Sequence, residues 1–298
     1  CIRDRPRRVY MSATFADESA IVRSFGCKKD DINVISPKTL AGVGRRMVLE
    51  IGAKEELRTA LVEKMIALAK DKKGVVVLEP SFATAEQWEQ LGIPTVKGSE
   101  VVQAVNDLKV SKLDTPIVFA NRYNGIDLPG DACRMLVVSG IPKGMSDHHK
   151  LMSKILVRSK VYARSIAQNI EQAMGRGTRG SGDYCVVALI GFDLCEWVND
   201  NRHAVFLTPT TRAQIECGQG IMNEVKSAKD FVEVIDQGVN DDPDFAAYLS
   251  SYVADKVNDF EFVDDSMLED FALCERKALN EWRKGRSGRA VELLKQFT

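Results

Sequence analysis

The stretch Val75-Val76-Val77-Leu78 decides the fold class of this chain. It follows Lys72-Lys73-Gly74, is too short for a helix and consists mostly of β-branched residues, so it predicts a buried strand. Three other runs of the same character lie at Pro116–Ala120, Met135–Val138 and Tyr184–Leu189. Short apolar runs that alternate with longer amphipathic segments are typical of βαβ units around a parallel sheet.

Two apolar stripes at helical spacing lie between these runs and carry charged residues on their other faces. They are formed by Leu57, Leu61, Met65 and Leu68, and by Val101, Val105 and Leu108. After about residue 210 the chain has longer helical patterns without β-rich runs. The sequence therefore predicts an α/β fold, a parallel sheet flanked by helices, followed by a helical C-terminal extension.

The composition sets further limits. The chain has 298 residues, 45% of them hydrophobic, and a net charge of -1. No apolar run approaches the roughly 18 residues of a membrane span, and no basic start leads into an apolar run, so we expect neither a span nor a signal peptide. Seven cysteines occur singly without a CxxC pair. They indicate reduced thiols in an intracellular protein, cytoplasmic or nuclear, rather than disulfides or a metal site.

The near-zero net charge hides a segregation of charge along the chain. Residues 150–180 contain seven Lys or Arg and one Glu, whereas residues 230–270 contain thirteen Asp or Glu and one Lys. The basic segment suits a polyanion, and the acidic one is either solvated or contacts a basic partner surface. A nucleic-acid partner is therefore not excluded.

The segment Gln172-Ala-Met-Gly175-Arg176-Gly177-Thr178-Arg179-Gly180 combines two arginines with glycines that allow close approach. Guanidinium groups suit phosphate oxygens, although two arginines alone are more typical of a solvated turn. The pattern Gln-x-x-Gly-Arg-x-x-Arg, continued by Asp183-Tyr184 before a strand, resembles motif VI of superfamily-two helicases. It is similar in particular to the DNA helicases related to the xeroderma pigmentosum group D protein and DinG.

This resemblance implies a RecA-like domain whose arginines complete the ATP site of a preceding RecA-like domain. Arg176 and Arg179 would then be the catalytic residues that reach the γ-phosphate. Gln172 and Gly175 would lie at the nucleotide.

The loop Asn124-Gly125-Ile126-Asp127-Leu128-Pro129, followed by Arg134 and a strand, resembles motif V of the same family. Taken alone it is an ordinary turn of Gly, Asp and Pro. The resemblance implies nucleic-acid contacts for Asn124 and Gly125 and an ATP-site role for Asp127. The family commonly carries Glu where this chain has Asn124.

Two shorter matches occur in the expected order. Met11-Ser12-Ala13-Thr14 resembles motif III and implies that Ser12 and Thr14 couple the ATP state to nucleic-acid binding. Leu78-Glu79-Pro80-Ser81-Phe82 resembles motif IV and implies a nucleic-acid phosphate contact for Ser81. The alternative for Ser81 is a simple cap on the helix that follows. The order and spacing of the four matches carry the resemblance, rather than any one of them.

No G-x-x-x-x-G-K-[ST] segment and no Asp-Glu-x-His stretch is present, so the usual ligands of ATP phosphates and Mg²⁺ are missing. The resemblance covers about residues 5–195 and implies the C-terminal half of an ATP-dependent helicase, with ATP and Mg²⁺ held mainly by an N-terminal half before Cys1. We expect this fragment alone to be inactive. The expected domains are residues 1–52, the end of the first RecA-like domain and a linker; 53–210, the second RecA-like domain; and 211–298, the helical extension.

The expected partners are nucleic acid, by preference single-stranded DNA, and the N-terminal RecA-like half, with a protein subunit at residues 230–270 as a further option. Two alternatives stay open: a non-enzymatic nucleic-acid-binding module, and a module that docks a partner through this acidic segment. Trp282, beside Arg283, Lys284 and Arg286, either stacks on bases or packs within the helical region, and packing is the simpler interpretation.

Overall fold

The computed structural model describes most of the chain. The described residues are 9–10, 19–27, 31–33, 35, 44–52, 54–122, 125–142, 151, 153–154, 159–178, 180, 182–260 and 266–295. The chain divides into two compact units. The larger unit comprises residues 39–262, and the smaller unit comprises residues 1–38 and 263–298.

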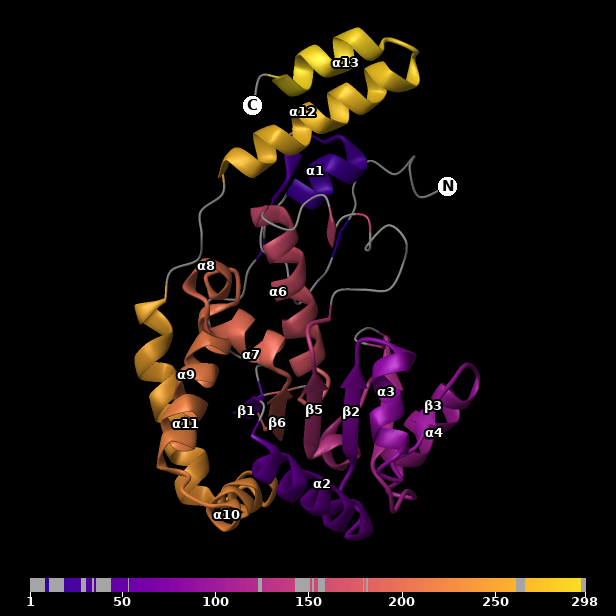
Figure 1. Cartoon of the computed structure of the whole chain (residues 1–298). Helices are drawn as coiled ribbons and strands as arrows, with labels where there is room; N and C mark the ends of the chain where they lie inside the picture. The colour runs from indigo at the N-terminus through magenta and orange to yellow at the C-terminus, as the bar shows by residue number, and fades with distance from the viewer. Residues whose placement is uncertain are drawn as a thin grey trace. The chain divides into compact units, whose positions relative to one another are not determined.

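The described part of the larger unit contains a six-stranded parallel sheet with the strand order β1-β6-β5-β2-β4-β3 (Figure 1). The strands are β1 Arg45–Gly52, β2 Val75–Glu79, β3 Thr95–Val96, β4 Ile117–Ala120, β5 Met135–Ser139 and β6 Tyr184–Ile190. The four runs that the sequence predicts as strands are β2, β4, β5 and β6, and these strands are buried almost throughout. Their uninterrupted apolar character follows from coverage on both faces of the sheet.

Helices cover both faces of this sheet. Those of the larger unit are α2 Glu55–Lys70, α3 Phe82–Glu89, α4 Glu100–Lys109, α6 Lys160–Met174, α7 Phe192–Asn199, α8 Asn201–Ala204, α9 Pro209–Glu224, α10 Ala228–Val239 and α11 Pro243–Lys256, with short 3-10 turns η3 Gly130–Cys133 and η4 Val257–Asp259. Side chains of α4, α6 and α7 pack on one face, and those of α2, α3 and α10 pack on the other. The result is a three-layer α/β arrangement, as predicted.

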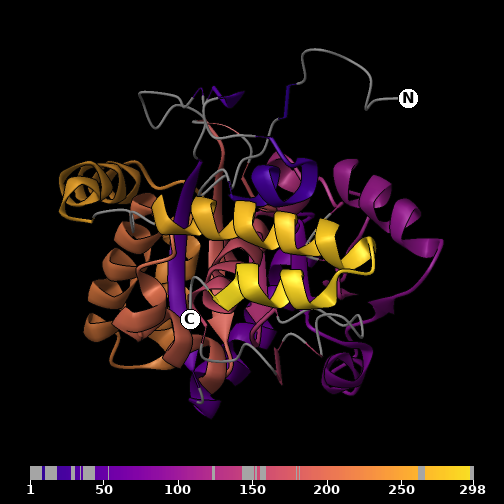
Figure 2. The ribbon, with the colours of Figure 1, turned by 90° about the horizontal axis from the view of Figure 1, so that it is seen from above.

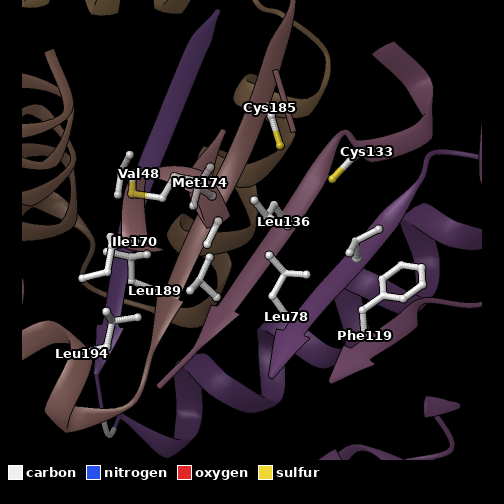
Figure 3. Close-up of a cluster of buried hydrophobic side chains, with 14 of the residues drawn as sticks. Val48, Leu78, Phe119, Cys133, Leu136, Ile170, Met174, Cys185, Leu189 and Leu194 are labelled. Atoms are coloured by element: carbon white, nitrogen blue, oxygen red, sulfur yellow. The ribbon is translucent and has the colours of Figure 1, made fainter. Parts of the chain in front are cut away.

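The core on the α6 side illustrates this packing. Leu78, Leu136 and Leu189 project from neighbouring strands toward the side chains of α6 and α7 (Figure 3). On the opposite face the predicted stripe of α2 is buried, with Leu61 and Met65 fully inaccessible. The apolar stripe of α2 and the apolar strand runs form one core layer, which is why the sequence predicts both the helix and the strands correctly.

Helix α9 covers the outer edge of β1. An added Cβ at Gly218 would lie 1.6 Å from the Val48 carbonyl oxygen, so the α9 backbone rests directly on the strand. Covering an edge strand in this way blocks its pairing with another chain.

The observed units differ from the boundaries expected at residues 52/53 and 210/211. Strand β1 pairs with β6 from Arg45↔Tyr184 onward, so it belongs to the same sheet as the other strands. Helix α10 buries Phe231 and Ile235 in the core on the α2 side and lies beside α2 (Figure 1). Pairing and burial therefore place residues on both sides of each expected boundary in the larger unit.

The smaller unit contains α1 Ser19–Phe25, α12 Ser266–Arg283 and α13 Ser287–Leu294. Helices α12 and α13 lie side by side (Figure 2), and Arg23 of α1 donates to Glu275 of α12 at 2.6 Å. Trp282 is 62% exposed, so the simpler interpretation, that this side chain packs within the helices, is wrong. Ser12 and Thr14 lie outside the described residues.

The predicted fold class is confirmed: a parallel sheet flanked by helices precedes a helical C-terminal region. Among the described residues, none of the helices combines the length and apolarity that crossing a bilayer requires.

Candidate functional site

The topology sends the predicted site residues to two opposite edges of the sheet. All strands are parallel, so β2, β4, β5 and β6 end at one edge, which we call the C-terminal edge. Helix α6 returns the chain to the opposite, N-terminal edge, where β6 begins at Tyr184. Ser81 therefore lies at the C-terminal edge, whereas the segment after α6, of which residues 175–178, 180 and 182–183 are described, lies at the N-terminal edge. We call this segment the arginine loop.

Glycines hold the arginine loop close to the sheet. Gly175 ends α6 and donates its main-chain N–H to the Glu171 carbonyl at 2.8 Å. An added Cβ at Gly177 would lie 2.4 Å from the Cys185 sulfur, so a larger residue would push the loop away from β6. The buried thiols of Cys133 and Cys185 lie at the start of β5 and β6 (Figure 3). The hydrogen bond between these thiols, together with burial, raises the pKa of Cys133 well above its ordinary value, so the Cys133 thiol stays protonated.

Arg176 joins the arginine loop to a second loop. Its Nε donates to the Gln172 carbonyl at 3.0 Å, and its Nη1 donates to the Ile126 carbonyl at 2.8 Å. The structure thus joins Arg176 to Gln172, which the sequence assigns to the same ATP site, and to Ile126, the neighbour of the third assigned residue, Asp127. Arg179 lies outside the described residues.

The second loop, of which residues 121–122 and 125–129 are described, begins after β4 at the C-terminal edge and ends at η3 just before β5. We call it the glycine–aspartate loop. Ile126 and Leu128 are buried to 2% and 0% exposure and anchor it, while Gly125 has a φ of +82° that favours glycine. The Asp127 carboxylate lies 3.9 Å from the Lys109 ammonium. Because it begins at one edge and accepts a hydrogen bond from Arg176, this loop connects the two edges of the sheet.

Arg134 and Asp183 fix the far ends of both loops. Arg134 Nη1 donates to Asp183 Oδ1 at 3.0 Å and to the Tyr184 carbonyl at 2.9 Å, and its guanidinium carbon lies 3.8 Å from the Tyr184 ring centroid. Asp183 Oδ2 also accepts the Gly130 N–H at 3.2 Å. The pair is nearly buried, with side-chain exposures of 11% and 13%. It ties the start of β5 to the start of β6. No site role was expected for either residue, although both occur in the quoted motifs.

Ser81 serves as the helix cap that was the alternative to a phosphate contact. Its hydroxyl accepts the Thr84 N–H at 3.1 Å, and the Thr84 hydroxyl in turn accepts the Ser81 N–H, which completes a capping box. A phosphate contact by Ser81 stays a prediction. Asn124 lies outside the described residues, and within the described ranges no group of three or more His, Cys, Asp or Glu side chains could hold a metal ion.

The comparisons with known proteins agree with this arrangement. Residues 65–192 match a family whose model is described as a helicase C-terminal domain. The matched stretch runs from within α2 to the start of α7 and contains the glycine–aspartate loop, Arg134 and the arginine loop. It confirms the resemblance of this part of the chain to a helicase C-terminal domain.

Two solved structures are also similar to the chain. They carry the titles "XPD_APO" and "XPD_Helicase", with sequence identities of 15% and 16% and a TM-score of 0.42 for each. The alignments cover 64% and 65% of this chain but only 46% and 41% of those chains, so this chain spans less than half the length of either. No curated protein sequence matches the chain.

Proposed function

We propose that this chain is the C-terminal motor half of an ATP-dependent nucleic-acid helicase or translocase. The observation that carries this proposal is the hydrogen bond from Arg176 to the Ile126 carbonyl. It links the arginine expected at ATP to a loop that begins at the opposite edge, where nucleic acid is expected. The match of residues 65–192 to a helicase C-terminal domain supports it.

In this proposal Arg176 and Arg179 stabilise the negative charge that develops on the transferred phosphoryl group. The two main-chain carbonyls that bind Arg176 restrict its guanidinium, and such preorganisation reduces the cost of reorientation during the reaction. Gln172, Gly175 and Asp127 would line the nucleotide. Another RecA-like domain would hold ATP and Mg²⁺, and Mg²⁺ would neutralise charge on the β- and γ-phosphates.

Coupling to nucleic acid would run through the glycine–aspartate loop. Movement of Arg176 as the ATP cleft closes would pull on the Ile126 carbonyl and so on the segment that holds Gly125 and Asn124. These residues and Ser81 would contact the backbone of a single strand, by preference DNA. Ser12 and Thr14 would report the ATP state from the other domain.

The test is ATP turnover by the whole protein that contains this chain, with and without single-stranded DNA. Arg179→Ala should abolish turnover and leave DNA binding largely intact, because the loss of an arginine finger costs about 10³–10⁵ in rate. Arg202→Ala, which removes an exposed arginine paired with Asp200, is the matched control. Undiminished turnover in Arg179→Ala would refute the catalytic role. Robust, Arg176-dependent turnover by the 298-residue chain alone would refute its assignment as half of a motor.

The two alternatives predict different outcomes. A non-enzymatic nucleic-acid-binding module would bind DNA but show no ATP turnover in the whole protein. A partner that docks through residues 230–270 is less favoured at α10, because two acidic side chains in or next to this helix, Asp236 and Asp241, already form ion pairs within the chain. Lys64 lies 2.5 Å from Asp236, and Arg45 lies 2.7 Å from Asp241.

A further inference from the structure

Two phenylalanines stand exposed at the C-terminal edge of the sheet. Phe82 is the first residue of α3, just beyond β2, and Phe192 is the first residue of α7, just beyond β6. Their exposed fractions are 49% and 69%. Strand β5 lies between β2 and β6, so the strand ends that carry the two rings are about 10 Å apart. Two large apolar side chains are thus exposed at the same edge of the sheet.

Small residues form the floor between the two rings. An added Cβ at Gly140, at the end of β5, would lie 3.6 Å from Pro80 Cγ and 3.9 Å from Asp193 Oδ1. An added Cβ at Gly191 would lie 3.3 Å from the Gly140 nitrogen, and the Gly140 N–H donates to the Ile190 carbonyl at 2.8 Å. The three turns therefore pack directly against one another. The turns after β2 and β6 that pack on Gly140 each begin a helix with an exposed phenylalanine.

Positive charge continues this edge beyond Phe82. Lys97 follows β3 and places its ammonium 5.6 Å from the centroid of the Phe82 ring. Arg122 follows β4 and is exposed. Acidic side chains near this edge include Glu89, 3.8 Å from Lys97, and Asp193, which accepts the Leu194 N–H at 2.9 Å in the first turn of α7. The edge thus presents cations on the β4–β3 side and aromatic rings on the β2–β6 side.

We propose that Phe82 and Phe192 are a stacking platform for unpaired bases of a single-stranded nucleic acid, with Lys97 and Arg122 contacting its phosphates. Aromatic side chains beside basic residues are the usual way to bind a single strand without reading its sequence. A duplex hides the faces of its bases, so the platform selects single strands. This inference rests on the proposed function and adds to it the groups that hold the bases.

The test uses the 298-residue chain and a fluorescent oligothymidylate about 20 nucleotides long, with binding followed by anisotropy at low salt. Phe82→Ala and Phe192→Ala should each weaken binding about 5- to 150-fold, which corresponds to about 1–3 kcal/mol of stacking per base. Phe192→Trp should keep the affinity, and the fluorescence of the new indole should be quenched when DNA binds. Tyr248→Ala, an aromatic of matched 49% exposure on α11, should bind like the unmodified chain.

Salt dependence separates the two parts of the platform. Lys97→Ala and Arg122→Ala should each reduce the slope of log affinity against log salt by about 0.7, whereas the phenylalanine variants should leave it unchanged. Circular dichroism melting curves confirm that each exposed-site variant is folded.

The outcomes distinguish this inference from the proposed function. If the unmodified chain binds no oligonucleotide, both fail. If it binds and the Phe82→Ala/Phe192→Ala double variant binds equally well, the platform is overturned while the motor proposal stands. If Trp282→Ala loses DNA binding while the phenylalanine variants keep it, the bases stack on the smaller unit and the platform is overturned. If the double variant keeps its DNA affinity but loses association with the RecA-like N-terminal half, the rings are a protein contact and the inference is again overturned.

Discussion

Arg134→Ala should destabilise the larger unit by about 3 kcal/mol. The substitution removes the hydrogen bonds from Arg134 to Asp183, Tyr184 and Asp131 and its stacking on the Tyr184 ring. Breaking a buried ion pair by deleting one partner typically costs about 3–5 kcal/mol. The lower end applies because Asp183 keeps the main-chain N–H groups of Gly130 and Tyr184. The bond to Asp131 adds little, since that carboxylate is 71% exposed.

A double-mutant cycle isolates the pair. Asp183→Asn keeps the size of the side chain but loses the charge and one acceptor, so it should cost about 1.5–3 kcal/mol. The Arg134→Ala/Asp183→Asn variant should then be about as stable as Arg134→Ala alone, so the coupling should equal the cost of Asp183→Asn, about 1.5–3 kcal/mol. Lys229→Ala is the control, because it removes one partner of an exposed pair in the same unit and should change the stability by less than about 0.5 kcal/mol.

Urea unfolding followed by tryptophan fluorescence provides the assay. Trp88 and Trp197 are buried in the larger unit, whereas Trp282 is largely exposed in the smaller unit, so the signal reports mainly on the larger one. An Arg134→Ala variant within about 1 kcal/mol of the unmodified chain, or a fully additive cycle, would refute the idea that this pair holds the two loops.

Two further predictions concern the packing of the larger unit. Gly218→Ala should destabilise it by about 1–3 kcal/mol or more in the same assay, because the new Cβ would lie 1.6 Å from the Val48 carbonyl oxygen. Gly220→Ala, on the same helix with open space around it, is the control and should be neutral or slightly stabilising. Equal effects of the two substitutions would contradict the close contact between α9 and β1. Burial raises the pKa values of Cys195 and Cys217 to about 11, so at pH 8 these thiols should be alkylated far more slowly than half-buried Cys27. Their alkylation rate should still rise above pH 9. Mass spectrometry locates the modified cysteines, and rapid modification of Cys195 or Cys217 at pH 8 would contradict the prediction.

The four apolar strands could be predicted from the sequence because burial on both faces leaves a continuous run of apolar residues. Strand β1 could not, since Arg46 and Glu50 interrupt its run. Their partners come from far along the chain: Gln214 accepts from Arg46 at 2.8 Å, and Gln219 donates to Glu50 at 2.9 Å. Without α9 in place, nothing local indicates that a charged strand pairs inside the sheet. The expected domain boundaries at residues 52/53 and 210/211 differ from the units for the same reason.

The candidate site shows a similar division. The segments around Arg176 and Asp127 could be located by pattern because each is continuous in sequence. The bond that joins them could not, because it ends on the main-chain carbonyl of Ile126, fifty residues from Arg176. Every residue has a main-chain carbonyl, so the sequence does not indicate which one accepts the hydrogen bond. The pairing of Arg134 with Asp183 spans forty-nine residues and was likewise visible only in three dimensions.

The arrangement of the sheet explains how one loop reaches both the C-terminal and the N-terminal edge. In a parallel sheet a strand-to-strand connection must cross from the C-terminal to the N-terminal edge, usually along a helix. Between β4 and β5 the described residues form only a short 3-10 turn, and Ile126 lies outside it, so the Ile126 main-chain carbonyl is not consumed by a helical hydrogen bond. The Ile126 carbonyl is therefore available to Arg176, while the buried Ile126 and Leu128 side chains hold the loop against the core.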